Sequence, residues 1–164
     1  MLGVLAPTSA TLAILLVILC VAALIDLRTG LIPNALTFGA TAFALMGWLV
    51  APPLEIAPVA AALAAAGLLW VLRAGSAQWL GVPGFGLGDI KLAIPMGVVL
   101  GWPVIWSLYL AVVLAAIVGI LGLVTGRLTR RSRLPFAPFM LGGVLLRFVL
   151  PFERVLDWLA ALPV

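Results

Sequence analysis

The sequence predicts an all-α membrane protein, a polytopic bundle of about six transmembrane helices. The chain has 164 residues, of which 66% are hydrophobic and only 9% are charged. Its mean hydropathy is +1.37, far above the value for soluble globular domains. Because no long polar stretch divides the chain, we expect a single integral membrane domain over residues 1–164.

The predicted spans are apolar segments that end at charges or helix breakers. A span needs roughly 20 apolar residues, with about 17 to 25 tolerated. No Lys or Arg precedes the first apolar run, as it would in a secretory signal, so we expect this run to be retained as a helix. A long uncharged stretch begins at Leu92 and needs a turn, which Gly101-Trp102-Pro103 supplies. The six spans are predicted at about Leu5 to Ile25, Ala35 to Ala51, Ile56 to Leu72, Ile90 to Gly101, Val104 to Thr125 and Pro135 to Leu150.

Basic residues concentrate in alternate connections, which predicts the orientation in the membrane. The loop at 52–55 and the turn at Trp102 contain no Lys or Arg. By the positive-inside rule the opposite connections are cytoplasmic and the N-terminus lies outside. After the sixth span, a short interfacial helix is expected on the outer surface, with Phe152, Val155, Leu156 and Leu159 on one face. The basic residues on the predicted cytoplasmic side are Arg28, Arg73, Lys91, Arg127, Arg130, Arg131 and Arg133.

Composition argues against several partners and chemistries. The net charge is +4, but the basic residues lie between apolar segments with no interleaved aromatic platform, so we expect no nucleic-acid partner. Cys20 is the only cysteine and the chain has no histidine. A disulfide within the chain and a thiolate metal site are therefore excluded, and we expect neither a metal nor a cofactor.

Two aspartates stand at the edges of apolar segments, where an ionisable side chain is costly unless it is paired or functional. Asp89 closes the glycine run that begins at Gly84 and precedes an apolar segment, so it is either a helix N-cap or a functional carboxylate. The glycines favour function, because they allow positive φ and the close approach of another chain. Asp26 is followed by Arg28, so an exposed ion pair is the alternative to a functional role.

The residues argue against phosphate or nucleotide binding by this glycine run. The carboxylate of Asp89 would repel an anion, and the Gly-Lys-Ser/Thr ending of a phosphate-binding loop is missing. Lys91 lies two residues after Asp89, on nearly the opposite side of a helix, so we interpret it as an anchor at the membrane interface and not as an ion-pair partner. Arg147 is predicted to snorkel to the outer interface. Pro33 is expected near the first position of the second helix.

Three motifs in order resemble those of the type IV prepilin peptidases, polytopic aspartic endopeptidases of the GxGD type. They are Asp26 followed by Ile32-Pro33-Asn34, then Gly86-Leu87-Gly88-Asp89-Ile90-Lys91, then Leu134-Pro135-Phe136-Ala137-Pro138-Phe139. The last motif has Ala137 where the family has glycine. The resemblance covers nearly the whole chain and implies Asp26 and Asp89 as the catalytic pair. Residues expected to shape the site or bind substrate are Gly86, Gly88, Lys91, Pro33, Asn34, Pro135, Phe136 and Pro138.

Larger members of that family carry a zinc-binding cysteine insertion between the first two spans and an N-methyltransferase activity. Only a short turn separates Asp26 from Ala35 here, so the resemblance is to the small, peptidase-only branch that serves tight-adherence pili. The implied substrate is a prepilin or pseudopilin precursor with a basic leader, a glycine before the cut and a hydrophobic helix after it. The implied location is the bacterial or archaeal cytoplasmic membrane, with the site near its cytoplasmic face.

Helix polarity suggests separate roles for the two carboxylates. Asp26 lies at a helix C-terminus, which disfavours a negative charge, and Asp89 lies at a helix N-terminus, which favours one. On this argument Asp89 is the ionised base and Asp26 the proton donor. Two other functions stay open on the residues alone: a proton-coupled transporter, whose helices are also interrupted by glycine and proline, and a non-catalytic membrane scaffold.

Overall fold

The computed structural model contains six α-helices in the residues that it describes, which are 9–50, 54–80, 84–129 and 134–150. The helices are joined by short turns, and the first two are separated only by residues 30–33. The predicted C-terminal interfacial helix and the arginines at 130, 131 and 133 lie outside the described residues. The helices are α1 Ser9–Thr29, α2 Asn34–Val50, α3 Ala57–Leu80, α4 Leu87–Leu100, α5 Pro103–Val124 and α6 Ala137–Val149.

Each predicted span corresponds to one helix, but several ends differ, three of them in ways that matter for the site. α1 continues to Thr29, α3 continues to Leu80 where the predicted span ended at Leu72, and α4 begins at Leu87 and not at Ile90. The reason is physical. Hydropathy indicates where side chains become too polar for lipid, whereas a helix ends where its backbone hydrogen bonds end. Asp26, Arg73 and Asp89 therefore lie inside helices.

The expected turn between the fourth and fifth helices is confirmed. Gly101 has a φ of 63°, and its N–H donates to the carbonyl of Gly97 at 2.8 Å. Positive φ costs glycine little because it has no Cβ. Pro103 then occupies the first position of α5, where a missing N–H leaves no intrahelical bond unmade.

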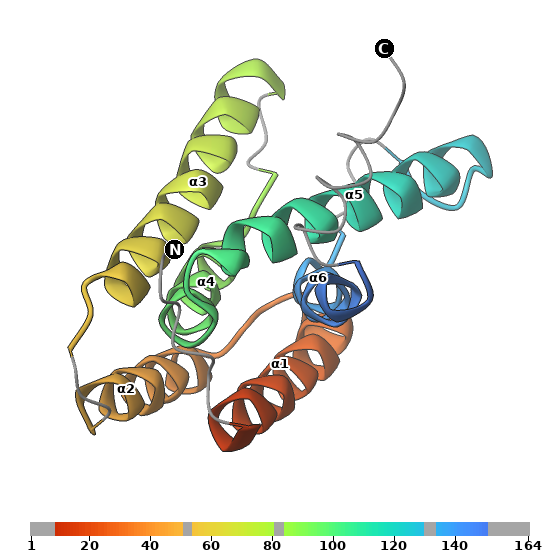
Figure 1. Cartoon of the computed structure of the whole chain (residues 1–164). Helices are drawn as coiled ribbons and strands as arrows, with labels where there is room; N and C mark the ends of the chain where they lie inside the picture. The colour runs from red at the N-terminus through yellow and green to blue at the C-terminus, as the bar shows by residue number, and fades with distance from the viewer. Residues whose placement is uncertain (1–8, 51–53, 81–83, 130–133, 151–164) are drawn as a thin grey trace, which may run out of the picture.

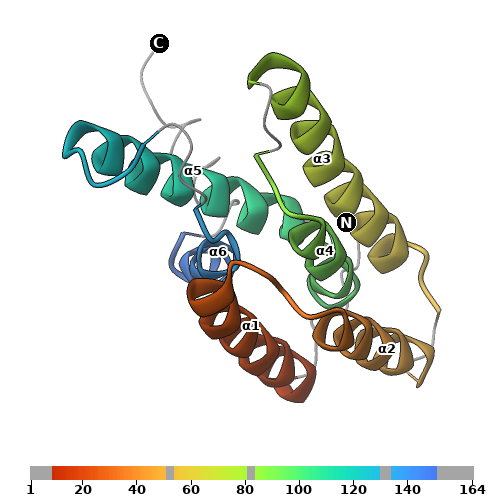
Figure 2. The same cartoon turned by 180° about the vertical axis from the view of Figure 1, so that it is seen from behind.

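α4 and α6 are the inner elements of two helix groups. α4 packs against α3 and α2, and α6 packs against α5 and α1. Figures 1 and 2 show α3 and α5 diverging from this centre in different directions. The largest core cluster joins both groups and includes Leu19 of α1, Met96 of α4, Leu108 of α5 and Met140 of α6. The ends of α1, α4 and α6 that carry the sequence motifs are thereby held in one bundle.

Glycines allow the closest helix contacts in both groups. A Cβ added to Gly97 of α4 would lie 2.2 Å from the Cα of Ala62 in α3, and one added to Gly143 of α6 would lie 2.1 Å from the carbonyl oxygen of Ser107 in α5. Small residues at such crossings are typical of helix association in membranes, where packing drives contact in place of water exclusion. These two crossings fix α4 and α6 against their neighbours.

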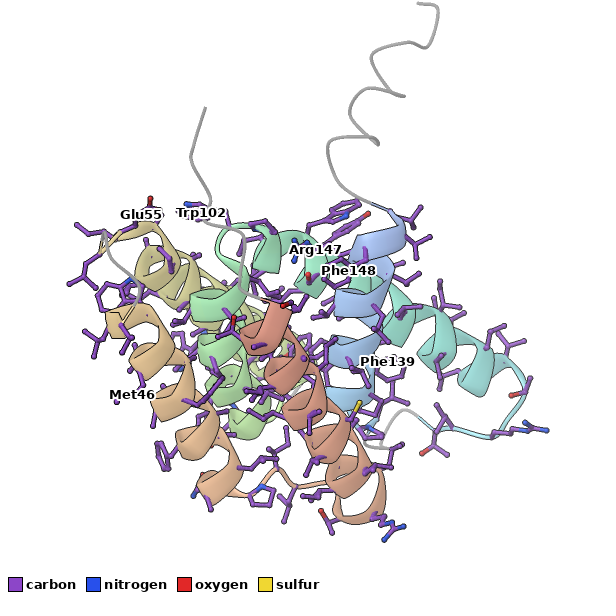
Figure 3. The ribbon with its side chains drawn as sticks, turned by 60° about the horizontal axis from the view of Figure 1, so that its bottom comes forward. Met46, Glu55, Trp102, Phe139, Arg147 and Phe148 are labelled. Atoms are coloured by element: carbon purple, nitrogen blue, oxygen red, sulfur yellow. The ribbon has the colours of Figure 1, made fainter. Side chains whose placement is uncertain are left out.

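Length and hydropathy support a membrane location. Three of the described helices, α1, α3 and α5, are long and apolar enough to cross a bilayer, and α2 and α6 are shorter apolar helices. Many large apolar side chains are exposed, such as Val17, Trp70 and Ile120, as expected for surfaces that face lipid. Figure 3 shows Glu55, Trp102 and Arg147 at one end of the bundle, with Phe139 nearer the other end.

Candidate active site

Asp26 lies in the last part of α1 and its carboxylate is buried, with 6% of the residue exposed. Its Oδ2 accepts a hydrogen bond from the backbone N–H of Ala137 at 3.0 Å. Ala137 is the first residue of α6, so its N–H has no partner within the helix and is free to bind a carboxylate. Arg28 is exposed. The alternative of an exposed ion pair between Asp26 and Arg28 is therefore wrong.

Asp89 is the third residue of α4 and is also buried, with 6% exposed. Its Oδ2 accepts a hydrogen bond from the N–H of Gly86 at 2.8 Å. Gly86 is the N-cap residue and has extended backbone angles. Asp89 is thus not the N-cap that the sequence suggested but the acidic residue that reaches back to it, as in half of a capping box. Its other oxygen, Oδ1, is buried and has no hydrogen-bond partner among the described residues.

The glycines of the run serve close approach and not positive φ. Positive φ occurs among the described glycines at Gly30, Gly101 and Gly126 only. A Cβ on Gly88 would lie 2.9 Å from the Cβ of Ile32, and a Cβ on Gly86 would lie 3.0 Å from Oδ2 of Asp89. The space beside these glycines is therefore occupied by the protein's own side chains. The freedom of Gly84, Gly86 and Gly88 to adopt positive φ is therefore not used, and the close approach of another chain to them stays a prediction.

The turn between α1 and α2 contacts the first turns of α4. Lys91 Nζ donates to Asn34 Oδ1 at 2.8 Å and lies 5.2 Å from the ring centre of Phe38. Pro33 immediately precedes α2, and its carbonyl accepts the N–H groups of Leu36 and Thr37 at 3.1 and 3.3 Å. Lys91 thus bonds Asn34. Its spacing predicted only that it would not pair with Asp89, and its role as an anchor at the membrane interface stays a prediction.

The start of α6 contacts both aspartate regions. Ala137 binds Asp26, and the neighbouring ring of Phe136 meets the ring of Phe85 edge to face, with centroids 4.8 Å apart. Phe136 is buried, with 6% exposed. Pro138 lies in the first turn of α6, and Pro135 lies just before the helix and is half-buried. Phe85, which the sequence analysis did not single out, therefore joins the glycine run to the third motif.

Charge also couples the two aspartates. The negative charge of Asp26 repels the charge of the Asp89 carboxylate, and the guanidinium of Arg73 attracts it. Each carboxylate accepts one N–H from the beginning of a helix, Asp26 from α6 and Asp89 from α4. Asp26 thus lies at the C-terminal end of its own helix but at the positive end of another. Helix polarity alone consequently does not separate their roles.

Two residues of α3 were missed as contacts of the glycine run. Arg73 Nη1 donates to the carbonyl of Phe85, and Ser76 Oγ accepts the N–H of Gly84 at 2.7 Å. In the sequence, Arg73 indicated only the orientation in the membrane. Nothing in the local pattern indicates these bonds, because they depend on how α3 packs against α4.

The chain was compared with known protein families and curated proteins. The model of the type IV leader peptidase family matches residues 13–126, which include Asp26, Arg73 and Asp89. The chain belongs to the type IV leader peptidase family. Ala137 lies beyond the matched residues, yet its backbone N–H binds Asp26, and the described non-glycine residues all have negative φ. Alanine is therefore accommodated where the resemblance expected glycine.

Curated relatives within this family are prepilin leader peptidase/N-methyltransferases. Those of Burkholderia pseudomallei strains 1026b and K96243 are each 33% identical over 142 residues, covering 80% of this chain and 44% of the relative. The protein of Bacillus subtilis strain 168 is 32% identical over 133 residues, covering 80% of this chain and 52% of the relative. The chain spans about half the length of the curated relatives it matches. No solved structure matches it.

Proposed function

We propose that this protein is a membrane-embedded aspartic endopeptidase that removes the basic leader from type IV prepilin-like precursors, with Asp26 and Asp89 as its catalytic pair. The observation that carries this proposal is the burial of both carboxylates, each of which accepts one hydrogen bond from the start of a helix, in two regions joined by the ring contact of Phe85 with Phe136. Membership of the leader peptidase family supports it.

Such a pair hydrolyses a peptide bond with one water and one shared proton. One carboxylate takes a proton from the water while the water oxygen attacks the carbonyl carbon of the peptide bond. The other carboxyl group gives its proton to the leaving nitrogen as the C–N bond breaks. Two close carboxylates favour this state because both cannot easily be ionised together. We assign Asp89 Oδ1 to contact with the water, because it is buried and is the oxygen of Asp89 that has no partner among the described residues.

The proposed topology has six spans, the N-terminus outside and the site at the cytoplasmic face. Glu55 and Trp102, from the connections without basic residues, lie at one end of the bundle together with Arg147 (Figure 3). The Ala137 N–H that binds Asp26 is at the beginning of α6, and Arg147 is in its last turn. This arrangement supports placing the catalytic pair at the end opposite Glu55.

The proposed substrate is a prepilin or pseudopilin precursor, and the name prepilin leader peptidase/N-methyltransferase of the relatives supports a prepilin. A site at the membrane boundary suits a peptide whose polar leader meets a hydrophobic helix there. We propose peptidase activity without methyl transfer. The connection from α1 to α2 comprises only residues 30–33, so the insertion associated with the larger enzymes is absent from this connection.

The proposal is tested with enzyme reconstituted in bilayers and a peptide that has a basic leader, a glycine and a hydrophobic helix. We expect Asp26→Asn and Asp89→Asn each to lower kcat by at least about 100-fold, since general acid or base catalysis contributes about 10²–10⁴-fold. Glu55→Gln is the matched control, because it removes a carboxylate at the other end of the bundle, and it should cleave like the wild type. Full cleavage by either folded asparagine variant would refute the catalytic pair.

A further inference from the structure

The C-terminal part of α3 contacts the loop that leads to Asp89. This part continues beyond the predicted span to Leu80, and Arg73 and Ser76 lie three residues apart in it. Residues at this spacing share a helix face. The hydroxyl of Ser76 also donates to the carbonyl of Arg73 at 2.9 Å, which orients it on that face.

Three consecutive loop residues are fixed by hydrogen bonds. The N–H of Gly84 donates to Ser76 Oγ at 2.7 Å, the carbonyl of Phe85 accepts from Arg73 Nη1, and the N–H of Gly86 donates to Asp89 Oδ2 at 2.8 Å. The first two bonds attach the loop to α3, and the third attaches it to the carboxylate. Arg73 and Ser76 thus bind the two residues that directly precede Gly86, whose N–H binds Asp89.

Glycine at 84 suits this arrangement. A Cβ there would lie 3.1 Å from Ser76 Oγ, the atom that accepts the Gly84 N–H. The guanidinium of Arg73 also attracts the charge of Asp89. Arg73 therefore acts on Asp89 in two ways, through the loop backbone and through its charge. An arginine that served only as a marker of membrane orientation would need neither contact.

We infer that Arg73 and Ser76 are positioning residues of the catalytic site: they clamp residues 84–85 to α3 and so hold the N–H of Gly86 against the carboxylate of Asp89. The inference deepens the proposed function and rests on it for its catalytic meaning. The clamp itself consists of hydrogen bonds within the chain, so it can be measured without substrate.

The first measurement is the kinetics of prepilin-peptide cleavage by Arg73→Met. We expect kcat to fall by about 10- to 100-fold, the range for one hydrogen bond to a charged group, while KM changes by less than about threefold because substrate contacts are retained. Arg73→Lys keeps the charge and a donor, and it should recover part of the loss. Arg127→Met is the matched control: it removes an exposed arginine after α5, on the same predicted side of the membrane.

The second measurement is hydrogen–deuterium exchange of the backbone amides in residues 84–89, which requires no cleavage. Arg73→Met should raise the exchange rate there by about tenfold, since local opening replaces a protected hydrogen bond. Arg127→Met should match the wild type. Ser76→Ala, which removes the acceptor of the Gly84 N–H, should change both readouts in the same direction by a smaller factor.

The outcomes separate the two claims. Wild-type kcat or wild-type exchange in a folded Arg73→Met enzyme would overturn the positioning role. If Arg73→Met does not fold, Ser76→Ala decides by the same two criteria. If the wild-type enzyme cleaves no prepilin peptide, the proposed function fails, and the exchange rates still decide whether the clamp exists.

Discussion

The two aspartates are held by different kinds of structure. Asp89 is bound by Gly86, three residues earlier in the chain, within a loop that α3 fixes from the side. Asp26 is bound by Ala137, which is 111 positions away, and the contact exists only because α1 packs against α6. The Asp89 region is thus built from local hydrogen bonds and then clamped. The Asp26 region is built by helix packing alone.

This difference suggests how each region should fail. Loss of a packing contact at α6 removes the Ala137 N–H, which is the one donor to Asp26 among the described residues. Loss of a contact at α3 leaves the bond from Gly86 to Asp89 possible but less well positioned. The ring contact between Phe85 and Phe136 is a direct connection between the two regions, so changes there test whether this contact couples them.

The largest expected effects come from the two glycine crossings. Gly97→Ala and Gly143→Ala place a Cβ 2.2 and 2.1 Å from backbone atoms of the neighbouring helix. Each should lower the free energy of unfolding by ~1–3 kcal/mol or more, the usual cost of overpacking. Unfolding in detergent measures this cost. Gly67→Ala and Gly119→Ala are matched controls, because a Cβ at either position meets nothing within 4 Å.

Amide exchange in the same variants sharpens the comparison between the regions. Gly97→Ala should speed exchange first at the Gly86 amide, on the α4 side, and Gly143→Ala should speed it first at the Ala137 amide, on the α6 side. Equal loss of protection at both amides in both variants would show that the regions open together. If Gly97→Ala and Gly143→Ala were as stable as the control variants, the close helix contacts at Gly97 and Gly143 would be contradicted.

A smaller effect is expected where the regions meet. Phe85→Leu and Phe136→Leu should show a coupling energy of about 0.5–1.5 kcal/mol in a double-mutant cycle, as edge-to-face aromatic pairs do. The cycle is measured by unfolding and repeated with kcat. Phe148, at the end of α6 near Arg147 (Figure 3), supplies the control: Phe148→Leu should be additive with Phe85→Leu. Additivity of the Phe85 and Phe136 variants would mean that this ring contact does not couple the two regions.

The smallest effect is expected for Ala137→Gly, which introduces the residue that the resemblance expects. The donor to Asp26 is the backbone N–H, which glycine keeps, and Ala137 needs no positive φ. Cleavage should stay within about twofold of wild type, and stability should fall by no more than about 1 kcal/mol, the cost of glycine within a helix. A large loss of cleavage would show that the methyl group itself positions Asp26.

Much of the architecture could be predicted because its causes are local. Runs of apolar residues located the six helices, and Gly101 followed by Trp102 and Pro103 located a turn that the structure confirms. α4 begins at Leu87, three residues before the predicted start at Ile90. The sequence did not indicate this start because Gly86 stands where a capping box usually has serine or threonine. A residue without a side chain gives no sequence indication that the acidic partner lies at the third helical position.

The sequence predicted which residues form the candidate site but not most of the contacts between them. Spacing and resemblance selected Asp26, Asp89 and the motif around Phe136, whereas the hydrogen bond between Lys91 and Asn34 was not predicted. The contacts of Arg73, Ser76, Phe85 and Ile32 were missed. Each joins segments from different helices or turns, and no periodicity within one segment encodes such a contact.

By itself, the sequence determined the helical membrane architecture, the approximate bounds of each helix and the two carboxylates at helix ends, because hydropathy and backbone hydrogen bonding act over a few residues. Only the tertiary structure decided that the start of α6 binds Asp26, that α3 clamps the loop before Asp89 and that Ile32 fills the space beside Gly88. These contacts follow from side-chain volumes at helix crossings, which place residues together regardless of their separation along the chain.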